Sequence, residues 1–545
     1  MENSATDFDR VLAAIRDADL RYPDEELLES FLEDSIDSEN AALYALQTCP
    51  ATRGGGLDLT PLLSDWKRLI AAEVSHEVPF HQQPDRVVAA DIWKRDGGKC
   101  CITGLTNSLF DPLVVAPILP IMKPIQKPLH NILKAFVGPE LQQWVLHGES
   151  HNAYRRYWLV RKSAATAFSR GFYQFEFDEG SVYYVAARRI GGPPWPSIHD
   201  KTPELRRGCF ADHSASGIVT PDISSLQLIS RFANPFRWSC VAREIAGKKL
   251  QPATKLPNTS LWHYVPERFV NTLISTWHLA PASFRILVYR CLGFIGAKVY
   301  GSSCSLKVQQ LPFGMYLKTA GLTWHEGLAN EYGALSLIRQ HTRMPAPRPL
   351  DLASDSDKSY LLTSRVSGVR LGSCIDTLSE DEGHLLVYDL QKYIGQLRAI
   401  PKDATSKYAI SNAVDEACYD HRVNMCLDYD ETRGDFVGPF INEAQFNKIL
   451  QTPALPNVSH CSGHNIFFTH SDLNLRNVLV RNGRLSGIVD WENSGWYPEY
   501  WDYTKAHFIT KLHRRWLRIV NAVFKRHGDY DSELAIERQL WDYCM

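Results

Sequence analysis

Between positions 1 and 47, apolar residues recur at roughly helical spacing, and this spacing is interrupted near Pro23. The recurring positions are Leu12, Ile15, Leu20, Leu27, Leu28 and Leu32. The stretch "CPATRGGGLDLTP" then predicts a linker, because its glycines have no side chains to pack, and a second helix is expected over residues 62–73. This pattern predicts an N-terminal helical region over residues 1–80.

A different pattern begins at residue 86. "GFYQFEFDEGSVYYVAARR" alternates apolar and polar residues on both sides of a turn at Gly180, which predicts a β-hairpin. "RVVAADIWKRDGGKCCITG" ends in a Gly-flanked hairpin signal, and "SAATAFSRG" predicts a helix. Residues 86–190 are therefore expected to form a small α+β module. Residues 191–280 are rich in proline, which predicts a loop-rich connecting region with short helices.

The pattern sharpens after residue 283. "AKVYGSSCSLKVQQLPFGMYLKTA" predicts two or three short strands with a turn at Gly301, and "SYLLTSRVSGVRL" predicts a further strand. "ANEYGALSLIRQHT" and "DEGHLLVYDLQKYIGQLRAIP" predict helices, the second of which ends before Pro401. Strands thus precede helices, and we expect residues 283–545 to form an α+β domain with a small sheet lobe followed by a mostly helical lobe.

Composition narrows the class of protein. The chain has 545 residues, of which 44% are hydrophobic and 22% charged, as is usual for soluble globular domains. The net charge of -2 offers no global attraction to nucleic acid or to an anionic membrane, so neither is expected as a partner. The 12 cysteines are scattered, which predicts reduced thiols. Because no signal peptide and no long apolar run stands out, we expect a cytoplasmic location and leave a nuclear one open.

One stretch, "THSDLNLRNVLVRNGRLSGIVDWE", carries the most informative residues. Asp472 and Asn477 precede an apolar strand, and a turn at Asn482 and Gly483 returns a second strand that delivers Asp490. The hairpin should therefore bring Asp472, Asn477 and Asp490 to one end. Phosphoryl transfer needs such a set: one carboxylate positions the acceptor hydroxyl and accepts its proton, and an amide oxygen and a second carboxylate hold Mg²⁺.

A kinase also needs a cation on the phosphates, held by an acid on a helix. Lys318 lies at the end of a predicted strand and Glu331 lies on the next predicted helix. Each residue alone is typical of a solvated surface, but their order before the Asp-Asn-Asp set is the order found in protein kinases. His470 is expected to brace the loop by hydrogen bonds. The aromatic residues of "GWYPEYWDY" are expected to pack this region against the helical lobe, with substrate stacking as the alternative.

"FTHSDLNLRNVLV", "LSGIVDWENSGWYPEYWDYTKAHF", "LPFGMYLKTAG" and "NEYGALSLIRQHTRMPAPRPL" resemble the aminoglycoside phosphotransferase/choline-kinase-like family, in its long fungal variants. The resemblance covers residues 285–510 and implies a bilobal protein-kinase-like fold that uses ATP and Mg²⁺ to phosphorylate hydroxyls of small molecules. It implies that Asp472 is the catalytic base and that Asn477 and Asp490 bind the metal ions. Lys318 would contact the nucleotide phosphates and pair with Glu331.

The same resemblance implies further nucleotide contacts in the sheet lobe. The segment ending at Val366 would be the hinge beside the adenine. The nucleotide loop would be "YGSSCS", which is poor in glycine, so that hydroxyl groups would add to its backbone donors. The hydroxyls would be those of Ser302, Ser303 and Ser305. Another departure from the family is Ser471, which stands where a glycine is usual.

"KRDGGKCCITGLTNSLFDPLVVAPILP" and "LVRKSAATAFSRGFYQFEFDEG" are similar to the HNH-type endonuclease fold. Such a nuclease needs a histidine to activate water and further His or Asn residues to hold the metal. Pro117 stands at the expected first histidine and Ala165 at the last, and neither can bind a metal or take a proton. The module is therefore expected to be a degenerate relic that does not cut. No zinc site is expected, because Cys100 and Cys101 are adjacent and cannot readily share one tetrahedral metal.

The main expectation is an ATP-dependent phosphotransferase that acts on a hydroxyl of a small molecule, with ATP and Mg²⁺ as cofactors. The poor glycine content of the nucleotide loop keeps open a non-catalytic nucleotide-binding or scaffold protein with a kinase fold. A metal-dependent nuclease in residues 86–190 is the third alternative. A protein partner that binds the N-terminal module stays open.

Overall fold

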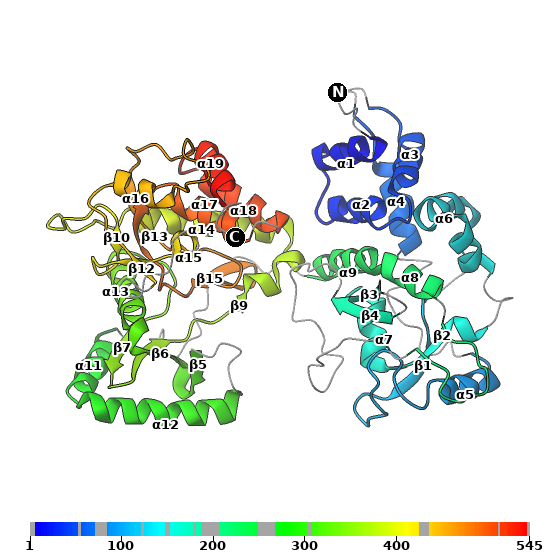
Figure 1. Cartoon of the computed structure of the whole chain (residues 1–545), viewed down its shortest axis with the longest axis horizontal. Helices are drawn as coiled ribbons and strands as arrows, with labels where there is room; N and C mark the ends of the chain where they lie inside the picture. The colour runs from blue at the N-terminus through cyan, green and yellow to red at the C-terminus, as the bar shows by residue number, and fades with distance from the viewer. Residues whose placement is uncertain are drawn as a thin grey trace. The chain divides into compact units, whose positions relative to one another are not determined.

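In the computed structural model (Figure 1), the chain forms two compact units, Met1–Lys249 and Leu250–Met545. The structure describes residues 6–52, 56–70, 84–120, 125–147, 153–178, 181–186, 208, 210–221, 223–248, 267–301, 308–424, 435–510 and 513–541. Within these residues, no single helix has the length and hydropathy to cross a membrane, although Phe269–His278 and Ala282–Tyr300, bent by 115°, meet that test as a pair.

Helices of the first unit pack around an aromatic core. They are α1 (Asp7–Asp17), α2 (Asp24–Glu33), α3 (Ser38–Thr48), α4 (Thr60–Arg68), α6 (His130–His147), α8 (Ile223–Arg231) and α9 (Ala233–Gly247). α1 begins at a capping box, in which the side chains of Thr6 and Asp9 each accept the other residue's backbone N–H. The centroids of the buried rings of Trp66 and Phe136 lie 4.7 Å apart, and Phe232 packs edge-on against Phe136. The N-terminal helices predicted from the apolar spacing are present.

Residues 223–247 were expected to contain short helices of a connecting region, and their two helices belong to the core of the first unit. They form α8 and α9, because Leu228, Phe232 and Phe236 stand four residues apart and bury their side chains fully in the aromatic core. Pro235 lies in the first turn of α9, where a missing N–H costs no hydrogen bond. The short helices expected here are thus present, and they are packed rather than merely connecting.

A second core of the first unit is formed by residues of helices and of two small antiparallel sheets. Its elements are α5 (Arg86–Arg95), β1 (Leu113–Pro117), β2 (Tyr157–Arg161), α7 (Lys162–Ser169), β3 (Tyr173–Asp178) and β4 (Ser181–Ala186), with β1 paired to β2 and β3 paired to β4. Trp158, Phe168 and Phe175 fill this core. The predicted hairpin over β3 and β4 and the predicted helix α7 are confirmed.

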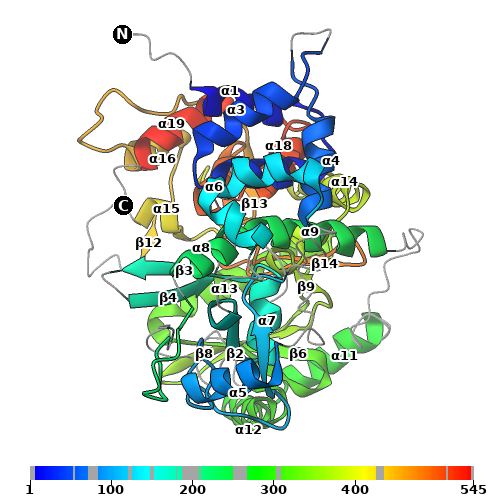
Figure 2. The ribbon, with the colours of Figure 1, turned by 90° about the vertical axis from the view of Figure 1, so that its right-hand side faces the viewer.

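The second unit contains a four-stranded antiparallel sheet, which follows two helices in the chain. Its strands β5 (Val308–Leu311), β6 (Met315–Gly321), β7 (Pro349–Ser354) and β8 (Lys358–Ser364) stand in the order β5-β6-β8-β7. Helix α13 (His325–His341) covers one face, where Leu361 and Leu328 belong to one small core. Helices α11 (Glu267–His278) and α12 (Ala282–Tyr300) cover the other face, where Leu362 belongs to a core with Ile286 and Tyr289 (Figure 1, Figure 2). Alternation along β8 thus divides the sheet between two helical layers.

The stretch 297–300, predicted as part of a strand, is the last turn of α12 instead. Strand β5 begins only at Val308. Gly296 lets the helix approach this strand closely, because an added Cβ there would overlap the carbonyl oxygen of Gln310. Helix α12 therefore lies against the edge strand of the sheet.

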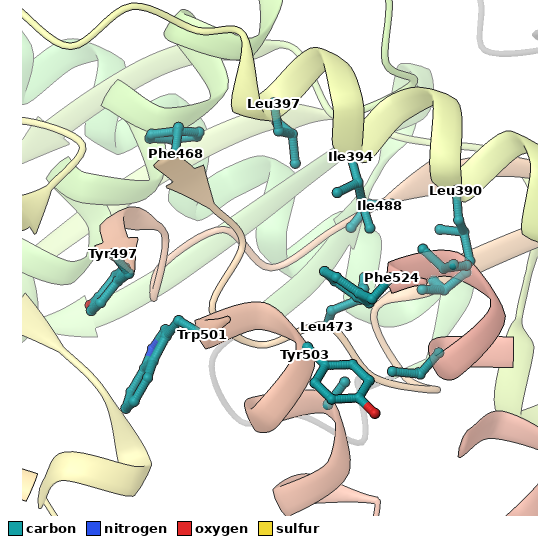
Figure 3. Packing of buried hydrophobic residues seen from close by; sticks show 14 of the residues in the cluster. Leu390, Ile394, Leu397, Phe468, Leu473, Ile488, Tyr497, Trp501, Tyr503 and Phe524 are labelled. Atoms are coloured by element: carbon teal, nitrogen blue, oxygen red, sulfur yellow. The ribbon is translucent and has the colours of Figure 1, made fainter. Parts of the chain in front are cut away.

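A larger helical lobe follows the sheet. Its helices are α14 (Glu380–Arg398), α15 (His421–Asn424), α16 (Glu443–Leu450), α17 (Trp501–Ile509), α18 (Arg514–Phe524) and α19 (Asp531–Trp541). Short strands form three small sheets: β9 (Val369–Arg370), β14 (Val478–Arg481) and β15 (Arg484–Ile488); β10 (Ser411–Asn412), β13 (Ile466–Thr469) and β16 (Gly495–Pro498); and β11 (Cys418–Tyr419) with β12 (Phe436–Val437). Figure 3 shows Leu390, Ile394 and Leu397 of α14 projecting into the core toward the loop and strands of the Asp-Asn-Asp motif.

Candidate active site

The loop between β13 and β14 is joined through the backbone to the end of β15. The turn residues Asn482 and Gly483 have φ of 50° and 70°, as a two-residue hairpin turn of this type requires. Beyond β15, the N–H of Val489 donates to the carbonyl oxygen of Asn477 at 2.9 Å. Asp490 therefore follows directly after a residue bonded to Asn477, which is the arrangement that the hairpin predicted.

Both carboxylate oxygens of Asp472 accept hydrogen bonds from amide side chains of its own loop. The Nδ2 atom of Asn474 donates to Oδ1 at 2.9 Å, and the Nδ2 atom of Asn477 donates to Oδ2 at 2.8 Å. Burial raises the pKa of Asp472 above its usual value. Asp472 is thus held rigidly, with a greater affinity for a proton than an exposed aspartate has. The sequence did not identify Asn474, although it lies two residues from Asp472.

His470 braces this loop, as expected. Its Nδ1 atom accepts the backbone N–H of Asp472 at 3.1 Å, and its Nε2 atom lies 3.0 Å from the carbonyl oxygen of Val489. Since Nδ1 accepts, the proton belongs on Nε2, which donates to Val489. Both ring nitrogens of the neutral imidazole are therefore used to join the loop to the end of β15.

Ser471 stands in the left-handed region, with φ of 65°, which explains why a glycine is usual there. Its hydroxyl donates to Asp420 at 2.9 Å and accepts from the indole of Trp501 at 2.9 Å. Its N–H donates to Asp502 at 2.7 Å, and Lys505 forms a fully buried ion pair with Asp420 at 2.7 Å. The loop before Asp472 is therefore anchored in the helical lobe.

The aromatic residues that follow the motif are packing residues. Tyr497 and Trp501 are fully buried, with stacked rings 5.7 Å apart. Trp501 also supplies the hydrogen bond to Ser471. This arrangement agrees with the predicted packing role and leaves these two rings no surface for a substrate.

Lys318 of β6 meets three carboxylates at one point. Its Nζ atom lies 2.8 Å from Glu331 of α13, 2.7 Å from Asp490 and 2.7 Å from Glu492. The structure therefore contains the ion pair predicted between Lys318 and Glu331 and adds both acids of the segment after β15. Glu492 was missed from the sequence, although it lies two residues after Asp490 on the same segment.

Charge and burial oppose each other within this cluster. Burial acts to lower the pKa of Lys318, but the charges of Glu331, Asp490 and Glu492 outweigh it and hold that pKa well above its usual value. Burial raises the pKa of Glu331, whereas for Asp490 the attraction of Lys318 exceeds the effect of burial and lowers the pKa. Lys318 and Asp490 are therefore a charged pair.

The residues present fit a divalent cation. Within the described parts of the chain, one group of three His, Cys, Asp or Glu side chains brings ligand atoms within 4.8 Å of one another: Glu331, Asp490 and Glu492. One ammonium does not neutralise three carboxylates. Asn477 uses its amide nitrogen on Asp472, so its oxygen is the atom left for a metal, and Asp490 has 41% of its side chain exposed. Such oxygen donors suit Mg²⁺.

The remaining nucleotide contacts are described only in part. Val366 follows β8 and is buried against β15, where an added Cβ at Gly487 would meet its side chain. Ser302, Ser303 and Ser305 lie outside the described residues. The expected hinge thus lies between the two lobes, and the expected phosphate contacts of the serines stay predictions.

In the first unit, Pro117 ends β1 and pairs with Tyr157 of β2, and Ala165 is buried in α7. Cys100 and Cys101 are buried in the core beside β2. Two paired strands followed by a helix are compatible with the predicted relic of an HNH-type nuclease. That resemblance stays a prediction.

Comparison with known proteins finds a family match within the second unit. A family model described as "Phosphotransferase enzyme family" (APH) matches residues 311–534. No curated protein matches the chain. Among solved structures, an aminoglycoside phosphotransferase APH(4)-Ia mutant in complex with ADP and hygromycin B is 14% identical in sequence. The match covers 46% of this chain and 87% of that protein, with a TM-score of 0.31. APH(3'')-Id from Streptomyces rimosus with ADP and streptomycin is 18% identical, covers 43% and 88%, and has a TM-score of 0.28.

A third similar structure, the GDP complex of an aminoglycoside 2'-phosphotransferase-IIIa mutant, is 15% identical, covers 47% of this chain and 86% of its own, and has a TM-score of 0.33. The family match spans the sheet from the end of β5 through α13 and the helical lobe into α19, and it includes Lys318, Glu331, Asp472 and Asp490. The C-terminal region of this chain therefore carries a kinase-like domain of the APH phosphotransferase family.

Proposed function

We propose that the second unit transfers the γ-phosphoryl group of ATP to a hydroxyl of a small molecule in a Mg²⁺-dependent reaction. The main observation behind this proposal is that the ammonium of Lys318 forms ion pairs of 2.8 Å or less with Glu331 and Asp490. Asp490 also follows Val489, whose backbone N–H donates to the carbonyl oxygen of Asn477. A phosphoryl-transfer site needs a cation, a metal-binding acid and a base. Lys318 would be the cation, Asp490 the metal-binding acid and Asp472 the base.

Asp472 acts as the base in this proposal. As the acceptor oxygen forms its bond to the γ-phosphorus, the bond from that phosphorus to the β,γ-bridging oxygen breaks and ADP leaves. The acceptor proton goes to the Asp472 carboxylate. Hydrogen bonds from Asn474 and Asn477 hold that carboxylate in one orientation, so that it can align the hydroxyl before transfer.

Asp490 and the amide oxygen of Asn477 would hold Mg²⁺, and Lys318 would contact the phosphates. When bound, the metal neutralises charge on the transferring group. Glu331 keeps the Lys318 ammonium directed toward Asp490 through the 2.8 Å ion pair. The roles of the nucleotide loop and of the hinge at Val366 follow the family resemblance.

An untargeted assay tests the proposal while the acceptor is still unidentified. A metabolite extract is incubated with Mg²⁺-ATP and either the wild-type chain or Asp472→Ala, and mass spectrometry detects masses that gain a phosphoryl group. We expect new phosphorylated products with the wild type only, since a positioned general base contributes about 10²–10⁴ in rate. A thermal shift with Mg²⁺-ATP should occur for both proteins. A wild-type chain that shows no shift would refute the proposal.

A non-catalytic nucleotide-binding protein is the second candidate. Lys318 contacts Asp490 and Glu492 directly, so phosphates must displace these partners to reach its ammonium. This candidate predicts a thermal shift with Mg²⁺-ATP but no phosphorylated product from any extract. For the nuclease alternative, incubation of plasmid DNA with Mg²⁺, Mn²⁺ or Ni²⁺ should leave the plasmid intact, because Pro117 and Ala165 offer no metal ligand.

A further inference from the structure

Asn330, the residue before Glu331 on α13, bonds to two separate segments of the helical lobe. Its Nδ2 atom donates to the carbonyl oxygens of Glu492 at 2.8 Å and Ser494 at 2.9 Å. Its Oδ1 atom accepts the backbone N–H of Ala413 at 2.7 Å. Only 2% of the residue is exposed. A helix packed on the sheet lobe is therefore fastened to the helical lobe by one buried side chain.

The chemistry of these contacts suits an asparagine. A primary amide has two N–H donors and one oxygen acceptor, and all three functions are used here. An aspartate would face two carbonyl oxygens with a carboxylate, and an alanine would leave two carbonyls and one N–H without their partner. Because these groups are buried, few alternatives can replace the amide bonds.

The contacts lie beside the lysine cluster. Glu331 accepts the N–H of Trp491 at 3.4 Å with one oxygen and binds Lys318 with the other. Consecutive residues of α13 thus hold the segment from Trp491 to Ser494, and Asp490 precedes that segment. Trp324, just before α13, adds a contact of 3.5 Å from its indole N–H to Glu492.

We propose that Asn330 is a positioning residue that locks α13 against the segment after β15, so that Lys318 and Glu331 are in place before any nucleotide binds. Its importance for transfer rests on the proposed phosphotransferase function. The lock itself is a property of the nucleotide-free chain. A helix held in this way cannot swing outward to separate Glu331 from Lys318 without breaking three buried hydrogen bonds.

The test compares Asn330→Ala with two control variants on the same helix in the full-length chain. Gln340→Ala changes an exposed residue near the end of α13, and Ile338→Val makes a small cavity in the core without touching the cluster. Hydrogen exchange of residues 325–341 is measured without nucleotide, at a temperature where every variant is folded. Binding of Mg²⁺-ATP and, once an acceptor is known, kcat and KM are measured under the same conditions.

We expect Asn330→Ala to increase exchange in α13 at least tenfold, to weaken Mg²⁺-ATP binding, and to lower kcat at least tenfold with little change in KM for the acceptor. Exchange in α14 should stay unchanged. Neither control should lower kcat, even where Ile338→Val lowers the melting temperature as much as Asn330→Ala does. The proposal is overturned if hydrogen exchange in α13 of Asn330→Ala is as slow as in the wild type, or if the variant lowers the melting temperature without changing exchange in α13 or kcat.

The exchange arm separates this proposal from the proposed function. If the wild type transfers no phosphate, increased exchange in α13 of Asn330→Ala still supports the lock. If the wild type does transfer phosphate and Asn330→Ala has wild-type exchange and kcat, the lock is wrong while the phosphotransferase function stands. Asn330→Asp should behave like Asn330→Ala in both arms, because it keeps the bond to Ala413 but loses both donated bonds.

Discussion

The ammonium of Lys318 lies 2.7 Å from a carboxylate oxygen of Asp490, although 172 residues separate the two along the chain. Strand β6 carries the lysine, and the segment after β15 carries the acid. The sheet lobe and the helical lobe of the second unit therefore meet at a charged contact. The same ammonium also binds Glu331 and Glu492.

Removing the lysine should expose the excess negative charge of this cluster. In Lys318→Ala, three carboxylates remain without the ammonium that they share, so Mg²⁺ alone should raise the melting temperature of the variant more than that of the wild type. Phosphate transfer should fall by about 10²–10³, the usual loss for a group that stabilises developing charge. Lys358→Ala, at an exposed position of β8, is the matched control and should respond to Mg²⁺ as the wild type does.

Ser471 offers a test of backbone conformation against hydrogen bonding. Ser471→Ala keeps the left-handed φ of 65° without the hydroxyl, so the free energy of unfolding should fall by about 1–3 kcal/mol. Ser471→Gly also loses the hydroxyl but removes the steric cost of this conformation, which is about 1–2 kcal/mol. In urea denaturation, the free energy of unfolding of Ser471→Gly should therefore be only slightly lower than that of the wild type, and that of Ser471→Ala should be the lowest of the three. A glycine variant less stable than the alanine variant would contradict this reasoning.

Gly293 and Gly296 of α12 should respond to alanine in opposite directions. Nothing lies near an added Cβ at Gly293, so Gly293→Ala should stabilise the second unit by about 0.5–1 kcal/mol through helix propensity. At Gly296 the added Cβ would overlap Gln310, and the variant should lose about 1–3 kcal/mol as α12 moves away from β5. Thermal or urea unfolding of the pair measures the difference, and equal effects at both positions would refute the close approach of α12 to β5.

Glu537 of α19 joins three buried groups: Arg422 at 2.7 Å, His460 at 2.9 Å and the indole of Trp541 at 2.7 Å. Glu537→Gln removes the charge that Arg422 needs, so the free energy of unfolding at neutral pH should fall by about 3–5 kcal/mol. The measurement is urea unfolding near pH 7. A loss below 1 kcal/mol would show that this cluster adds little stability.

The same residue predicts a dependence on pH. Burial acts to raise the pKa of Glu537, but the hydrogen bond from His460 and the charge of Arg422 outweigh it, so the pKa in the folded protein is lowered. Its contribution is therefore complete above the unfolded pKa of about 4.3 and is lost as pH falls through the lower folded value. Melting curves below about pH 4.3 should show the wild type losing its advantage over Glu537→Gln; an advantage that stays constant to low pH would contradict the assigned shift.

Local patterns were enough to predict much of the second unit. The Asn482-Gly483 turn, the flanking strands and the helix that carries Glu331 are determined by residues close together in the sequence, and the structure contains them. The order of Lys318, Glu331, Asp472 and Asp490 indicated a kinase-like domain, and the APH family match covers these residues. Their roles in catalysis stay a proposal.

Other features depended on the folded chain. Glu492 and Asn330 carry no sequence signal of their own, because an acid or an amide on a loop or helix is usually solvated, and their contacts are made with residues far away in the chain. Asn474 differs, since its partner Asp472 lies in the same loop. Helices α8 and α9 were expected only as short helices of a connecting region, and their place in the core depends on Trp66 and Phe136, which lie far away in the chain. The sequence by itself determined the hairpin, the helices and the types of chemical group available, because these follow from neighbouring residues. Only the tertiary structure decided which groups meet at Lys318, because burial and charge pairing join residues that are far apart in the chain.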